Sequence, residues 1–101
     1  MKKIYMIGDM HTVSAFRLSG VEGMVSHTDN VSARLEEVMA KKDAGIILLT
    51  NRLAVNLQAR IREINFNVAD TVIIEIPGID DTEGLSRSAM RYVSEALGIP
   101  L

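Results

Sequence analysis

The chain has 101 residues, 48% of them hydrophobic, a size and composition typical of one folded domain. Eleven basic and thirteen acidic residues give a net charge of −2, which does not favour binding to nucleic acid or to an anionic membrane. The absence of cysteine excludes a disulfide scaffold, an iron–sulfur cluster and a cysteine nucleophile. The longest apolar run, residues 44–49, is far below the roughly 20 residues of a membrane-spanning helix. We expect a soluble protein with a single domain over residues 1–101.

The beginning of the chain predicts a strand followed by a helix. Residues 3–7 form a short apolar run that is typical of a buried strand. Asp9 or Thr12 can accept a hydrogen bond from the first turn of a helix over residues 13–19. Gly20 suits the left-handed end of that helix.

The middle of the chain repeats this alternation. Residues 21–26 predict a weak second strand, because Gly23 lies inside it. From Val31 onward apolar residues recur at helical spacing, which predicts a second helix that ends at residues 43–45. Residues 46–49 form a continuous apolar run, which is typical of a parallel strand covered on both faces.

The second half predicts two further helices and one strand. Asn51 can cap a helix whose apolar stripe consists of Leu53, Leu57, Ile61 and Ile64. A polar break over residues 65–70 is followed by a fourth strand, residues 71–76. Residues 78–84 predict a loop, and residues 85–97 predict a last, amphipathic helix.

The repeated strand–helix units indicate an α/β fold. Parallel strands need crossover connections, and these are right-handed, so the helices divide between the two faces of the sheet. We expect a small, doubly wound, four-stranded parallel sheet of order 2-1-3-4, flanked by helices and similar to the flavodoxin or response-regulator type. Residues 1–78 would form the α/β core. Residues 79–101 would form a loop and an amphipathic C-terminal helix used for partner docking.

The default ligand site of such a sheet is the crevice at the carboxyl ends of the first and third strands, where the strand order reverses. Residues 8–12 and 50–52 would line it. The chain lacks the acidic pair and the late lysine of a phosphate-accepting receiver domain, and it lacks the glycine-rich patterns that bind phosphate. His11 and His27 lie sixteen residues apart, and nothing in that spacing makes them converge on a metal. We therefore predict no catalytic residue, no cofactor and no metal.

The apolar face of the last helix admits two interpretations. It consists of Leu85, Ala89, Tyr92, Val93, Ala96 and Leu97. Within one small domain this face would cover the sheet. Alternatively, the helix docks into a groove on another protein of a complex. Composition alone does not separate the two.

Three segments of the chain, taken in order, resemble a known family. The first combines Ile7-Gly8-Asp9 with Thr12-Val13 and residues 16–21, the second covers residues 43–50, and the third is Glu75-Ile76-Pro77-Gly78. They resemble the opening, the D-x-G-I-I-L-I stretch and the E-I-P-[SG] turn of the F subunits of V-type and A-type ATPases, the small component of the rotor stalk. The resemblance spans nearly the whole chain.

The resemblance implies a noncatalytic part of a rotary complex. The F subunit of that family binds the coiled-coil D subunit of the central stalk, rotates with it inside the catalytic headpiece, and couples ATP turnover to proton or sodium movement. The resemblance thus implies a cytoplasmic protein, peripheral to the membrane, without membrane insertion and without nucleic acid as a partner.

On this basis we expect a partner-binding face on the last helix and secondary contacts at the first strand end. The face would be Leu85, Ala89, Tyr92, Val93 and Leu97, with Arg87 and Arg91 as charges at its rim. The secondary contacts would be Asp9, Met10, His11 and Thr12. Two alternatives stay open: a regulatory domain that binds a small ligand or phosphate in the crevice, and an unrelated homodimeric interaction module.

Overall fold

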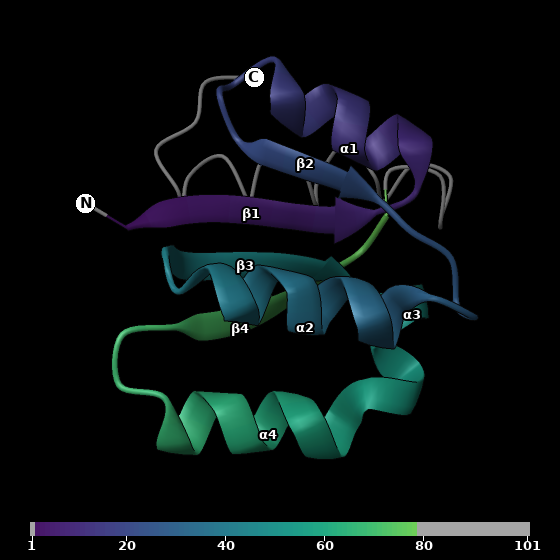
Figure 1. Cartoon of the computed structure of the whole chain (residues 1–101). Coiled ribbons are helices and arrows are strands. Elements are labelled where there is room, and N and C mark those ends of the chain that lie inside the picture. Colours follow the sequence, from purple (N-terminus) through teal and green to yellow (C-terminus); the bar gives the residue numbers. More distant parts are fainter. Residues whose placement is uncertain (1, 79–101) are drawn as a thin grey trace.

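A computed structural model describes residues 2–78 of the chain (Figure 1). The predicted loop and last helix, residues 79–101, lie outside the described residues. The elements in chain order are β1 (Lys3–Gly8), α1 (Met10–Arg17), β2 (Glu22–Val25), α2 (Val31–Lys41), β3 (Ala44–Thr50), α3 (Asn51–Ala54), the 3-10 turn η1 (Val55–Leu57), α4 (Gln58–Asn67) and β4 (Val72–Ile76). Each predicted strand is present, with ends shifted by a few residues at most.

The four strands form one parallel sheet of order β2-β1-β3-β4, as predicted. Ile7 of β1 lies opposite Leu49 of β3, and Thr50 of β3 lies opposite Ile76 of β4. The carboxyl ends of all four strands therefore lie at the same end of the sheet, and the strand order reverses between β1 and β3.

Alternate residues of the strands point into two separate cores. In β1, Tyr5 and Ile7 face the core that α2, α3 and α4 cover, and Met6 faces the core under α1. Figure 1 shows α1 beside β2 and β1, with α2 and α4 beside β3 and β4. The helices thus divide between the two faces, which confirms the doubly wound arrangement.

Helix α1 begins three residues before the predicted start. Asp9 caps it, so Thr12, the other predicted cap, lies within the helix. The helix ends at Arg17, and Gly20 has the expected left-handed backbone (φ 84°) but lies in the turn beyond the helix. The predicted end at residue 19 was therefore too late.

The long helix predicted after β3 is broken into two. α3 and α4 are separated by η1, where Val55 and Asn56 are weak helix formers. The side-chain amide of Gln58 donates to the carbonyl oxygen of Ala54 at 3.0 Å, which satisfies a carbonyl near the break. The predicted stripe still faces the sheet, because Leu53, Ile61 and Ile64 are buried and Leu57 is half-buried.

The residue predicted to cap this helix does not cap it. Asn51 is the first residue of α3, and Thr50 occupies the position before the helix without a side-chain capping bond. Thr50 is buried at the end of β3, so the chain passes directly from strand to helix. This direct passage brings the start of α3 to the carboxyl edge of the sheet.

Candidate functional site

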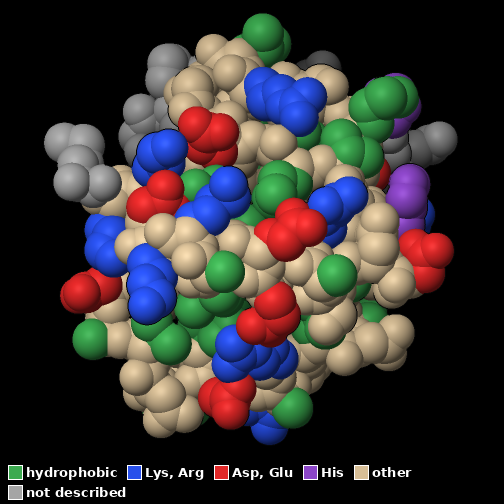
Figure 2. All heavy atoms as spheres, viewed as in Figure 1, with side chains coloured by type: hydrophobic (Ala, Val, Ile, Leu, Met, Phe, Trp, Pro, Cys, Tyr) green, Lys and Arg blue, Asp and Glu red, His purple; other side chains and the backbone are tan. Residues whose placement is uncertain are grey.

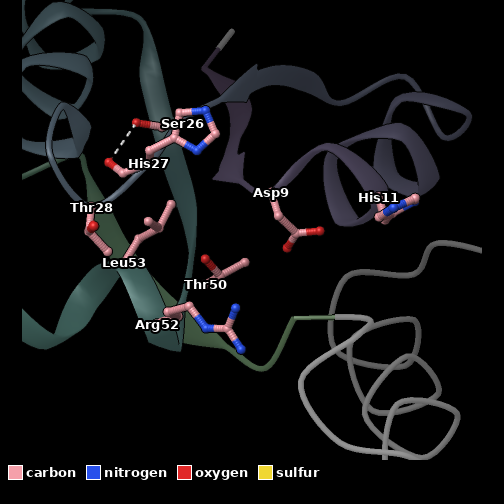
Figure 3. A pocket seen from close by; sticks show the side chains of 8 residues that line it. All are labelled: Asp9, His11, Ser26, His27, Thr28, Thr50, Arg52 and Leu53. Carbon is pink, nitrogen blue, oxygen red and sulfur yellow. Dashed lines mark hydrogen bonds between the residues drawn. The ribbon is translucent and has the colours of Figure 1, made fainter.

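The carboxyl ends of the strands surround a pocket of about 300 Å³ (Figure 3). The described residues that line it are Asp9, His11, Ser26, His27, Thr28, Thr50, Arg52 and Leu53. The pocket lies where the crevice was predicted, at the reversal of strand order. The sequence interpretation missed the contribution of residues 26–28. Their position directly after β2, which neighbours β1, is the signal that could have found them.

Asp9 is held in place by the helix that it caps. Its two carboxylate oxygens accept hydrogen bonds from the backbone N–H of Thr12, at 3.1 Å, and from the Thr12 hydroxyl, at 2.7 Å. Partial burial raises the pKa of Asp9, but these bonds favour the charged form and the net pKa is lowered. Asp9 is therefore an ionised capping residue at neutral pH.

Gly8, which directly precedes Asp9 at the end of β1, leaves room for the side chain of Thr50 in β3. A Cβ atom at Gly8 would lie 2.8 Å from Cγ2 of Thr50 and 3.0 Å from Cε of Met6. The contact with Thr50 is too short, because the Thr50 side chain is buried in a closely packed interior. The glycine of the family-like Ile7-Gly8-Asp9 segment thus has a packing role.

The loop after β2 is fixed by Asn30. Its side-chain oxygen accepts a hydrogen bond from the backbone N–H of His27 at 2.8 Å and from the hydroxyl of Ser26 at 2.7 Å. Ser26 is buried and its backbone N–H donates to the carbonyl oxygen of Gly8 at 3.0 Å. This wall of the pocket is therefore tied to the end of β1.

The two histidines do not converge. Figure 3 shows the imidazoles of His11 and His27 on opposite sides of Asp9. Within residues 2–78, no group of three or more His, Asp or Glu side chains is placed to hold a metal ion. The pocket offers a carboxylate, a guanidinium, two imidazoles that lie apart, and the hydroxyl groups of Ser26, Thr28 and Thr50.

The predicted secondary contacts differ in their accessibility. Met10 is 60% exposed and His11 is exposed, whereas Asp9 is half-buried and Thr12 is buried. The predicted partner-binding residues of the last helix lie outside the described residues: Leu85, Arg87, Ala89, Arg91, Tyr92, Val93 and Leu97. Contact of either set with a partner stays a prediction.

Charges of both signs are mixed over α2 and α4. Figure 2 shows Lys and Arg side chains interspersed with Asp and Glu side chains on this face. Arg34 pairs with Glu37 at 3.0 Å, and Arg60 pairs with Glu36 at 2.8 Å. This face therefore presents no extended positive surface of the kind that nucleic acid selects. No helix within the described range is long and apolar enough to cross a membrane.

Comparison with known proteins identifies the family. Residues 4–93 match the family described as ATP synthase (F/14-kDa) subunit. The chain belongs to this family. The match covers the four strands apart from Lys3, the first residue of β1, and confirms the resemblance of the three sequence segments.

Relatives in this family cover most of the chain. The F subunit of the A-type ATP synthase of Pyrococcus furiosus is 32% identical over an alignment 108 positions long, which covers 98% of this chain and 97% of that protein. The corresponding A-type protein of Thermococcus sibiricus is 35% identical over 81 residues, 74% of each protein. The F subunit of the V-type ATP synthase of Fusobacterium nucleatum is 31% identical over 74 residues, 73% of this chain and 70% of that protein. Membership of the F/14-kDa family thus rests on both A-type and V-type relatives.

Proposed function

We propose that this chain is the noncatalytic F subunit of a V/A-type ATP synthase and part of its central stalk. It binds the coiled-coil D subunit, turns with it inside the catalytic headpiece, and couples ATP synthesis or hydrolysis to proton or sodium transport. It works in the cytoplasm at the periphery of the membrane. The family match over residues 4–93 is the observation that carries this proposal.

The packing of the described residues supports a mechanical role. Large side chains in both cores, such as Phe16, Leu35 and Ile47, are at most 2% exposed. Closely packed interiors have low compressibility and transmit strain. Helices pack closely against both faces of the sheet, so the domain is suited to transmit force between the coiled-coil D subunit and the catalytic headpiece.

The face of residues 85–97 is our candidate for docking on the coiled coil. An amphipathic helix binds a partner through apolar residues at i, i+3, i+4 and i+7, and this face has that spacing. Arg87 and Arg91 would steer the encounter from the rim. Met10 and His11, both exposed, are the candidates for additional contacts.

Co-expression with the cognate coiled-coil protein tests the function and the docking face separately. We expect the wild-type chain to co-purify with it in a stoichiometric complex. Val93→Asp places a charge on the predicted apolar face and should lower the yield of complex at least about tenfold. Ser94→Asp introduces the same charge at a position outside that predicted face and is the matched control.

The outcomes distinguish two kinds of failure. Repeated failure of the wild-type chain to co-purify would count against the stalk function itself. A wild-type complex that tolerates Val93→Asp as well as Ser94→Asp would keep the function and reject the docking face. Thermal unfolding of each isolated variant shows whether the folded domain has survived the substitution.

A regulatory domain that binds phosphate is the second candidate, because a pocket exists at the predicted place. Its charges do not favour a dianion: Arg52 brings a positive charge, but the ionised carboxylate of Asp9 lines the same pocket. The pocket is also no larger than two hollows of about 320 and 350 Å³ elsewhere on the domain. We therefore favour the stalk function. A saturable rise in Tm with inorganic phosphate, lost in Arg52→Ala, would reverse this preference.

A further inference from the structure

At the outer edge of β4, a side chain from a helix binds the backbone polar groups of Ile73. β4 pairs with β3 on one side, and on its other side no strand of residues 2–78 pairs with it. The side chain of Asn65 in α4 forms two hydrogen bonds with the backbone of Ile73 in β4. The backbone N–H of Ile73 donates to Oδ1 at 2.7 Å, and Nδ2 of Asn65 donates to the carbonyl oxygen of Ile73 at 3.2 Å.

This pair of bonds replaces those that another strand would make. A neighbouring strand accepts from one N–H and donates to one C=O of the edge residue. A primary amide carries its acceptor and its donor on two separate atoms, so it can bond the N–H and the C=O of one residue at the same time, whereas a hydroxyl has both functions on one oxygen. Ile61 and Ile64 are buried and hold α4 against the sheet, and Asn65 follows directly at the sheet edge. The sequence had placed Asn65 in a polar break, so this role was not predicted.

The opposite edge of the sheet has a similar arrangement. Nη2 of Arg17 in α1 donates to the carbonyl oxygen of Gly23 in the edge strand β2 at 2.9 Å. A Cβ atom at Gly23 would lie 2.5 Å from Cγ1 of Val13 and 2.8 Å from Nε of Arg17. Gly23, the residue that made the prediction of this strand weak, has no side chain and therefore leaves the space in which Arg17 lies across β2.

Without the two bonds from Asn65, the β4 edge would be prone to pair with a strand of another molecule. Its sequence, Val-Ile-Ile-Glu-Ile, has high β propensity, and Val72 and Ile74 are 41% and 37% exposed. An open edge flanked by exposed β-branched residues is a template for pairing with another copy of the same chain. We propose that Asn65 closes the β4 edge against a second copy of this chain and so keeps the isolated protein monomeric. This inference is independent of the proposed stalk function.

Substitution of Asn65 in the full chain tests the proposal. In Asn65→Ala and Asn65→Ser we expect self-association, measured by light scattering after size-exclusion chromatography at about 100 μM. The amide of Ile73 should exchange its hydrogen at least about tenfold faster at concentrations low enough to avoid association. Asn67→Ala, at an exposed position of the same helix, should behave like the wild type.

A second substitution locates the association at β4. Because lysine on an edge strand opposes strand pairing, Ile74→Lys in the Asn65→Ala background should restore the monomer. Circular dichroism identifies the folded variants, and Asn65→Ser carries the test if Asn65→Ala does not fold. A folded Asn65 variant that stays monomeric would overturn the proposal, even with faster exchange at Ile73. Self-association of the wild-type chain through β4 would overturn it as well.

Discussion

The hydroxyl of Tyr5 in β1 donates a hydrogen bond of 2.7 Å to the carboxylate of Asp43, which lies immediately before β3. Tyr5 is buried within the core that α2, α3 and α4 cover. Burial first, and then the bond to Asp43, raise the pKa of Tyr5 to about 12. The same hydrogen bond lowers the pKa of Asp43, beside which Lys3 lies at 3.7 Å. The Tyr5 hydroxyl thus links β1, one of the two inner strands, to the residue that precedes β3, the other inner strand.

The alkaline stability of the protein should depend on Tyr5. Folding raises the pKa of Tyr5 from 10.0 to about 12, so its contribution is complete below pH 10 and is lost as the pH rises through 12. We expect the free energy of unfolding of the wild type to fall more steeply over this range than that of Tyr5→Phe. Chemical denaturation at several pH values measures the difference. Because Tyr92 is a second tyrosine, the tyrosinate absorbance is followed in a Tyr92→Phe background, where Tyr5 is the one tyrosine left. Absorbance that developed near pH 10 instead of near pH 12 would refute the assignment.

Asp9 should stabilise the protein as the cap of α1. Loss of an N-cap costs about 1 kcal/mol, within a range of roughly 0.5–2, and this is the expected effect of Asp9→Ala at pH 7. Folding lowers the pKa of Asp9, so the contribution is present above the unfolded value near 3.9 and is lost as the pH falls through the folded value. Urea denaturation should therefore show the two proteins converging as the solution is acidified. Asp29→Ala, at an exposed position in the loop after β2, is the control.

Gly8→Ala should destabilise the protein through a contact with one methyl group. The new Cβ would lie 2.8 Å from Cγ2 of Thr50, and overpacking of this kind costs about 1–3 kcal/mol. Thr50→Ser removes that methyl group, so Gly8→Ala should cost much less in the Thr50→Ser background. A double-mutant cycle by urea denaturation measures the coupling. Equal costs in both backgrounds would mean that another contact, such as the one with Met6, decides the effect.

The ion pair between α4 and α2 should contribute little. Nε and Nη2 of Arg60 donate to the two carboxylate oxygens of Glu36, each at 2.8 Å, and Arg60 also pairs with Glu63. The side chains of Arg60 and Glu36 are 36% and 48% exposed, so water and salt screen the pair. A cycle of Arg60→Ala and Glu36→Ala should give a coupling of about 0.2–1 kcal/mol that shrinks in high salt. A coupling that is unchanged in high salt would show that packing, and not charge, links the helices.

Much of the fold could be predicted because its signals are local. The continuous apolar run of residues 46–49 indicated a buried parallel strand, and the helical spacing that begins at Val31 indicated α2. The break at η1 was not predicted, since apolar periodicity continues across it from Leu53 to Ile61 and the pattern does not reveal where the backbone changes course. The start of α1 was misplaced because two residues could cap it, and the pattern did not choose between them.

By itself the sequence determined the fold class, the order of the strands and the family. Alternating apolar segments of limited length allow few parallel topologies, and each family segment is a short local stretch that can be read without knowing the fold. The tertiary structure decided which distant residues meet. Tyr5 reaches Asp43, Gly8 makes room for Thr50, and Asn65 closes the edge beside Ile73. Each of these contacts depends on strand register or on the way a helix lies over the sheet. A shift of one residue along a strand would separate the partners, although the pattern of apolar residue types in the sequence would be unchanged.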